Sequence, residues 1–159
     1  MAVEFDAKLW RKRARTKKNR RNSTLQSDYA LIRKISVIVD WAETRGLTVQ
    51  FSRHGSYTKD SLINISSHSS LQTQFLDIIH ECGHQLIGDR KPNQRYGKGY
   101  PFGTIYEART LVQKVDILDE EAEAWNRGFR LAARLGVPPH RGTYDVYRAK
   151  MVASYARLV

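Results

Sequence analysis

Apolar residues near the start of the chain return every three or four positions between residues 28 and 45. This spacing is typical of an amphipathic helix with one face in a core. We expect Ser27 or Asp28 to cap that helix and Gly46 to end it. The sequence therefore predicts that the folded part begins with a helix at about residue 28, and that residues 28–159 form a single domain.

Two strands are predicted to follow this first helix. Residues 47–51 alternate between apolar and polar side chains, and residues 61–66 are rich in apolar, β-branched positions. The segment 54–57 between them contains Gly and Ser and predicts a turn. Short strands next to amphipathic helices predict an α+β fold.

The remainder of the chain is mainly helical in pattern. One helix is expected to start near Ser70, behind a capping box formed by Ser69 and Gln72. Residues 89–106 are rich in Gly, Pro and charge and predict a long loop. A short helix is expected over residues 107–115, and a longer helix over residues 117–135 that ends at Gly136. A last helix is expected after Thr143, which could cap it.

A metal-binding motif lies at the end of the amphipathic run 71–79, with the sequence His80-Glu81-Cys82-Gly83-His84. Residues four apart project from the same helix face, so the two imidazoles can bind one metal ion. Glu81 is turned about 100° away, where its carboxylate could reach a water on that metal. The alternative interpretation is two histidines on a solvated helix face, with Glu81 as an ordinary surface charge.

The 117–135 helix is the expected source of a third metal ligand, because a catalytic zinc site has three protein ligands and an open position. On a helical wheel Glu121 is the carboxylate that falls in the apolar stripe, and a buried carboxylate is usually paired or metal-bound. We expect Glu120 and Glu123 to be solvated and paired with arginines, although either remains an alternative third ligand. The alternative for Glu121 is a buried salt bridge. The apolar stripe contains Leu118, Ala122, Trp125, Gly128, Phe129, Ala132 and Leu135.

The net charge of +11 is concentrated at the N-terminus. Residues 1–21 carry nine Lys and Arg against two acidic residues, a net charge of +7. This segment has few apolar residues, and like charges repel, so we expect residues 1–27 to form a flexible basic arm. Such an arm could bind nucleic acid through phosphate contacts, or it could be a solvated tail without a partner.

Composition limits where the protein is expected to act. The chain is 41% hydrophobic, and none of its apolar runs approaches the roughly 20 residues needed to cross a bilayer. We see no secretory signal segment, and the single cysteine, Cys82, excludes an internal disulfide framework. We therefore expect an intracellular protein without a membrane partner, in the cytoplasm or, if it is viral, in the host cytoplasm or the virion. The pattern leaves the oligomeric state open.

The order of elements resembles that of the zincin metallopeptidases. Within them the chain is similar to the gluzincin-like ImmA/IrrE family of small intracellular and phage-encoded metallopeptidases, whose pattern is H-E-x-G-H followed by E-x-E-A-x-x-F/W. The resemblance covers roughly residues 28–135, and Asp119 replaces the first Glu of the second motif. The matching residues are His80, Glu81, Gly83 and His84, then Glu121, Ala122 and Trp125.

The resemblance implies a zincin-like domain with a small, mainly antiparallel sheet packed on the H-E-x-x-H helix and further helices after it. It implies one Zn²⁺ per chain held by His80, His84 and Glu121, with Glu81 as the general base. Zinc would lower the pKa of a bound water towards about 7. The wider gluzincin group often has Asp where this chain has Trp125, so the residues that support the metal ligands should differ.

Three functions are consistent with the sequence. The first is a zinc-dependent metalloendopeptidase that hydrolyses peptide bonds of a protein substrate. The second is a nucleic-acid-associated or virion-associated binding protein that uses residues 1–21 and keeps a structural or inactive zincin core. The third is a metal hydrolase acting on a non-peptide bond, because site chemistry alone does not name the substrate. His140, Tyr144 and Tyr147 could donate to a substrate oxyanion, or they could be ordinary core and surface residues.

Overall fold

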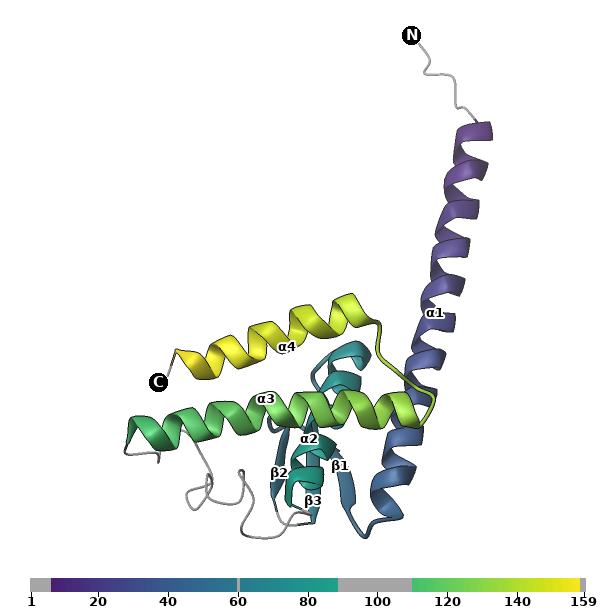
Figure 1. Cartoon of the computed structure of the whole chain (residues 1–159). Coiled ribbons are helices and arrows are strands. Elements are labelled where there is room, and N and C mark those ends of the chain that lie inside the picture. Colours follow the sequence, from purple (N-terminus) through teal and green to yellow (C-terminus); the bar gives the residue numbers. More distant parts are fainter. Residues whose placement is uncertain (1–6, 60, 89–109, 158–159) are drawn as a thin grey trace.

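The computed structural model describes the backbone of residues 7–59, 61–88 and 110–157, and side chains within residues 25–58, 61–88 and 110–157. Across these residues the chain has an α+β fold with four helices and a three-stranded sheet (Figure 1). The predicted loop 89–106 lies outside the described residues. The elements are α1 (Ala7–Glu43), β1 (Thr48–Ser52), β2 (Tyr57–Lys59), β3 (Leu62–Ser66), α2 (Leu71–Gly88), α3 (Leu111–Arg134) and α4 (Arg141–Ala156).

The first helix begins far earlier than the sequence pattern predicted. α1 starts at Ala7, so Ser27 and Asp28 lie inside the helix and cap nothing. The stretch has neither Gly nor Pro and is rich in Lys, Arg, Ala and Leu, which all favour helix. Most of the predicted arm is therefore a continuation of α1, and its N-terminal half extends away from the rest of the molecule (Figure 1). Gly46 ends the helical segment as predicted, with φ of +75°.

The sheet is mixed, so the expectation of a mainly antiparallel sheet is wrong. β3 is the central strand; it pairs in parallel with β1 and antiparallel with the shorter β2. The predicted turn at residues 54–57 overlaps the start of β2, a strand that the pattern missed. β2 lies at an edge of the sheet and runs antiparallel to both other strands. β3 therefore lies between β1 and β2 and runs in the same direction as β1. The result places Thr58 opposite Ile63, on the edge strand.

The starts of the later helices differ slightly from the predictions. Ser70, not Ser69, caps α2, because its Oγ accepts a hydrogen bond from the backbone N–H of Thr73 at 3.2 Å. α3 starts behind a Thr110–Gln113 capping box and continues unbroken through the described part of the predicted 107–115 helix. α4 begins at Arg141, so Thr143 lies inside it and is not the cap.

The core gathers around α2, which packs against α1, the sheet and α3, while α4 packs against α3. α1 also contacts the connection between α3 and α4, because Lys34 Nζ donates to the carbonyl oxygen of Pro138 at 2.8 Å. The buried residues of the core are Ile35, Ile38, Ala42, Ile63, Ile65, Phe75, Leu76, Ile78, Ile79, Cys82, Trp125, Leu131, Ala132 and Tyr144.

Among the residues that the structure describes, no helix is both long and apolar enough to span a membrane.

Two glycines allow α2 and α3 to cross at very short range. A Cβ placed on Gly83 would lie 2.0 Å from the carbonyl oxygen of Ala124, and a Cβ on Gly128 would lie 2.0 Å from that of Ile79. Real Cβ atoms do not approach backbone oxygens so closely, so neither position tolerates a side chain at this helix separation. The crossing brings the second half of α2 against the middle of α3, where the predicted metal ligands lie.

Candidate metal centre

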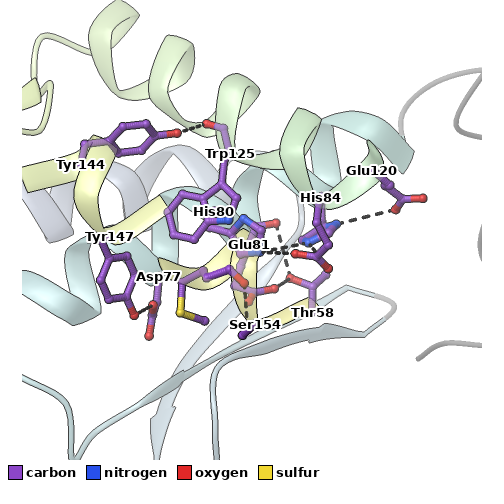
Figure 2. A network of polar contacts seen from close by, with 12 residues as sticks. Thr58, Asp77, His80, Glu81, His84, Glu120, Trp125, Tyr144, Tyr147 and Ser154 are labelled. Carbon is purple, nitrogen blue, oxygen red and sulfur yellow. Dashed lines mark hydrogen bonds and ion pairs between the residues drawn. The ribbon is translucent and has the colours of Figure 1, made fainter. Parts of the chain in front are cut away.

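His80, His84 and Glu121 lie together at the crossing of α2 and α3. Figure 2 shows the two histidines side by side on α2. The two Nε2 atoms of the histidines are 3.2 Å apart. Glu121 Oε2 is 3.2 Å from His80 Nε2, and Glu121 Oε1 is 3.5 Å from His84 Nε2. The structure thus brings together the three residues that the sequence predicted as ligands, with both imidazoles using the same ring nitrogen.

These separations fit a tetrahedral zinc ion. Ligands at about 2.0–2.1 Å from zinc in tetrahedral geometry lie roughly 3.3–3.4 Å from one another. The two Nε2 atoms are 3.2 Å apart, and they lie 3.2 and 3.5 Å from different oxygens of the Glu121 carboxylate. Taken with one ligand atom from each residue, the three atoms lie within 4.8 Å of one another. Two imidazoles and one carboxylate are also the donor set of known catalytic zinc sites. The cluster could therefore hold zinc with little rearrangement.

Trp125 fixes the orientation of the His80 ring. Their ring centroids are 4.2 Å apart with planes 19° from parallel, and Trp125 itself is buried. Within the described part of the chain, His80 Nδ1 is buried without a hydrogen-bond partner. A stacked indole therefore supports His80 where many zinc-binding histidines have a polar partner on the second nitrogen. Trp125 thus contacts His80 by stacking, at the position where the sequence comparison with gluzincins led us to expect different support for the metal ligands.

Glu81 is held by a residue that the sequence did not single out. Thr58 Oγ1 on the edge strand β2 donates to Glu81 Oε2 at 2.7 Å (Figure 2). The Glu81 side chain is buried on α2, next to the cluster but outside the three-residue set. A hydrogen bond to one carboxylate oxygen fixes the torsions of the side chain and leaves the other oxygen to accept a proton. Thr58 gave no signal in the sequence, because only tertiary structure brings β2 to α2.

Glu120 is buried, contrary to the prediction that it would be solvated and paired with an arginine. Its side chain is 12% exposed, and Oε1 lies 3.7 Å from His84 Nδ1, on the side of the ring away from the cluster. The apolar stripe of the helical wheel left out Ala124 and Leu131, which are both buried in the structure. Ala124 lies against Gly83 of α2, so the buried face of α3 extends to Glu120. The run of three consecutive acids at residues 119–121 was the sequence feature that could have indicated a second carboxylate near the histidines.

Glu123 is paired with an arginine as predicted, but it is half-buried and not solvated, with its side chain 19% exposed. Its Oε1 accepts from Arg127 Nε at 2.9 Å, one helical turn later. Arg127 is buried, and its Nη1 donates to the carbonyl oxygen of Leu86 at 2.7 Å. The cluster is therefore formed by Glu121, with Glu120 behind one histidine and Glu123 directed towards Arg127. Among the described residues, Glu121 is the carboxylate that groups with the two histidine nitrogens in an arrangement that could hold a metal ion.

The buried carboxylates near His80 and His84 favour a positive charge in the cluster. Burial lowers the pKa of His84, but the carboxylates of Glu120, Glu121 and Glu81 outweigh burial and raise that pKa to about 10. Burial raises the pKa of Glu121, but contacts with His80 and His84 outweigh it and hold the pKa well below its ordinary value. A divalent cation would replace the proton that His84 otherwise carries, because both compensate the same carboxylates.

The proposed oxyanion donors have other contacts. Tyr144 is buried and its hydroxyl donates to the carbonyl oxygen of Trp125. The hydroxyl of Tyr147 donates to Asp77 Oδ1 at 2.8 Å (Figure 2). The rings of Tyr147 and Trp125 pack edge to face, with their centroids 5.7 Å apart. His140 is exposed at the N-cap of α4. The two tyrosines support Trp125 and α2, which agrees with the alternative that they are ordinary core residues.

Comparison with known proteins finds no matching family model, no matching curated protein and no matching solved structure.

Proposed function

We propose that this protein is a zinc-dependent metallopeptidase of the zincin type, which hydrolyses peptide bonds in a protein substrate. One observation carries the proposal. The Nε2 atoms of His80 and His84 and the carboxylate of Glu121 converge from two helices with spacings of 3.2–3.5 Å, and Glu81 follows the first ligand directly. Two histidines four residues apart with an adjacent glutamate are the residues that zinc-dependent hydrolysis requires.

Each residue of the site has a part in this chemistry. His80, His84 and Glu121 would hold the metal, and zinc when bound supplies a Lewis acid that activates water and polarises a carbonyl. Glu81 takes the proton of the attacking water on its free carboxylate oxygen and gives it to the leaving amine. Thr58 keeps Glu81 in place, because its hydroxyl donates to Oε2. Trp125 keeps the His80 plane fixed and excludes water from one side of the ring.

Metal analysis of purified protein tests the site. We expect about one equivalent of zinc in the wild type and little in Glu121→Ala, because two imidazoles alone hold zinc far more weakly than three ligands. Glu123→Ala is the matched control: it removes a carboxylate from the same helix that contacts Arg127 instead. It should keep its zinc. Zinc retained in Glu121→Ala would move the third ligand elsewhere.

Hydrolysis itself is tested on the same preparations. We expect the wild type to degrade an unfolded probe protein such as reduced casein, to stop when a chelator removes the metal, and to recover when zinc is returned. A zinc-loaded protein that cleaves no peptide probe but hydrolyses an ester or amide of another class would favour the non-peptide hydrolase instead. The measurement is the appearance of new amino termini.

Nucleic-acid binding is a second candidate function, favoured by the position of the basic residues. The segment 1–21 carries a net charge of +7, and from Ala7 it continues α1 away from the rest of the molecule (Figure 1). A projecting basic helix can approach a phosphate backbone without interference from the domain. The arm could thus bring the proposed peptidase to protein substrates on a nucleic acid.

Removing residues 1–21 should weaken binding to duplex DNA by at least about 10-fold near 0.1 M salt and flatten the dependence on salt, because fewer counterions are released. The measurement is fluorescence anisotropy with a labelled duplex at several salt concentrations. The control is the double change Arg130→Ala, Arg134→Ala, which removes positive charge from exposed positions of α3. Equal affinity of the truncated and complete chains would show that the arm has no such role.

A further inference from the structure

We propose that Glu120 is a positioning residue for the metal centre, which orients His84 from behind so that its Nε2 faces the metal. This inference rests on the zinc site proposed above, and not on the peptide-bond hydrolysis proposed for it. Figure 2 shows Glu120 on the far side of the His84 ring from His80 and Glu81. Glu120 would therefore act through the ring and would not be a ligand itself.

Burial is the first reason to give Glu120 a specific role. Its residue is 9% exposed, although it belongs to a run of three acids on a helix with a solvated face nearby. A carboxylate withdrawn from water is costly unless a positive or donating group compensates it. The structure supplies that group as His84 Nδ1, 3.7 Å from Glu120 Oε1. Asp119, the neighbour on the solvated side, is exposed.

The geometry of His84 assigns the two ring nitrogens different tasks. Nε2 lies 3.2 Å from His80 Nε2 and 3.5 Å from Glu121 Oε1, so it faces the cluster. Nδ1 faces Glu120. A negative charge beside Nδ1 keeps a proton on that nitrogen, so a metal that binds the ring would take the lone pair of Nε2. It also makes the imidazole a stronger donor ligand.

The two histidines are supported in different ways, which makes the role of Glu120 testable. His80 is stacked on Trp125, and its Nδ1 has no hydrogen-bond partner among the residues described. His84 is the more exposed of the two, with 18% of its side chain accessible against 10%. Packing therefore holds one ring, and a carboxylate holds the other. Loss of Glu120 should release His84 and leave His80 in place.

The test is zinc affinity, measured by competition with a chromophoric chelator on the full chain. We expect Glu120→Ala to weaken zinc binding by about 10-fold to 100-fold, the usual effect of removing a carboxylate behind a metal-bound histidine. Glu120→Gln should fall between the wild type and Glu120→Ala, because it removes the negative charge but keeps an oxygen beside Nδ1. Glu120→Gln also preserves the shape of the side chain, so it carries the test if the alanine variant does not fold.

Glu123→Gln is the matched control, because it removes the same charge from the same helix without touching His84. It should bind zinc within about twofold of the wild type, because the glutamine keeps the length of the side chain and neither histidine loses a neighbour. In zinc-loaded protein, proton NMR should show a slowly exchanging His84 Nδ1–H resonance in the wild type and in Glu123→Gln. The same resonance should exchange faster and broaden in Glu120→Ala, because the carboxylate that shields Nδ1–H is gone.

The outcomes separate the role of Glu120 from the function of the whole site. Equal zinc affinity in Glu120→Ala and Glu123→Gln overturns the positioning role. Complete loss of zinc in Glu120→Ala, as in Glu121→Ala, also overturns it and makes Glu120 a ligand. No zinc in the wild type overturns both this inference and the proposed peptidase. Zinc bound by the wild type, weakened in Glu120→Ala and accompanied by no peptide hydrolysis leaves Glu120 in its role and rejects the peptidase.

Discussion

Glu81→Gln is expected to lower kcat for peptide hydrolysis by about 10³-fold while the protein still binds one equivalent of zinc. A positioned general base contributes roughly 10²–10⁴-fold to such reactions, and an amide cannot accept the proton of water at neutral pH. Glu81 belongs to α2 but is outside the three-residue cluster, so the change leaves the ligands intact. Glutamine has the same length, and its amide oxygen can still accept from Thr58.

The measurement is kcat on a fluorogenic peptide or on casein fragments, with zinc content determined on the same samples. Glu123→Gln provides the comparison, since it makes the same chemical change on a helix of the same site and should keep activity within about twofold. If Glu81→Gln holds zinc and cleaves as fast as the wild type, Glu81 is not the general base. Loss of zinc in that variant would instead make Glu81 part of the coordination.

Gly83→Ala is expected to destabilise the metal-free protein by about 2–3 kcal/mol and to weaken zinc binding as well. The new methyl group would lie 2.0 Å from the carbonyl oxygen of Ala124, which is backbone and cannot move aside as a flexible side chain can. Alanine gains about 1 kcal/mol over glycine in a helix interior, but overpacking a rigid contact outweighs this gain. The helices must separate, and Glu121 then moves away from His80 and His84.

Chemical denaturation and zinc competition measure the two effects. Gly128→Ala should behave in the same way, because its methyl group would lie 2.0 Å from the carbonyl oxygen of Ile79. Gly88→Ala adds the same group to α2 where no described atom lies within 4 Å, and it should stay within about 0.5 kcal/mol of the wild type. Wild-type stability and zinc affinity in Gly83→Ala would mean that the site does not depend on this close crossing.

The helices were predictable from the sequence more fully than the sheet was. Apolar spacing located α2, most of α3 and the end of α1, because each helix buries one face and its pattern is local. Strand pairing depends on partners that are distant in sequence, so neither the mixed sheet nor strand β2 could be read from local pattern. The start of α1 was missed because charge was taken as a sign of disorder, although Lys and Arg are good helix formers.

The candidate site divides in the same way. The positions of His80, Glu81 and His84 on one helix follow from helical spacing, and Glu121 follows from the cost of burying an acid. Glu120 and Thr58 could not be assigned, because each is defined by its contact with a residue on another element. The predicted apolar stripe included Gly128 but not Ala124, although Ala124 lies on the face of α3 that contacts Gly83 of α2.

By itself, then, the sequence determined which helix faces are apolar, which residues share a helical turn, and which side chains can bind a metal, because these properties depend on neighbours a few positions apart. The tertiary structure alone decided how closely α2 and α3 approach, which nitrogen of each histidine faces the cluster, and which residues stand behind His84 and Glu81. Those features depend on backbone contacts between segments some 40 residues apart, such as Gly83 with Ala124. Burial and packing fix such contacts, and no local pattern encodes them.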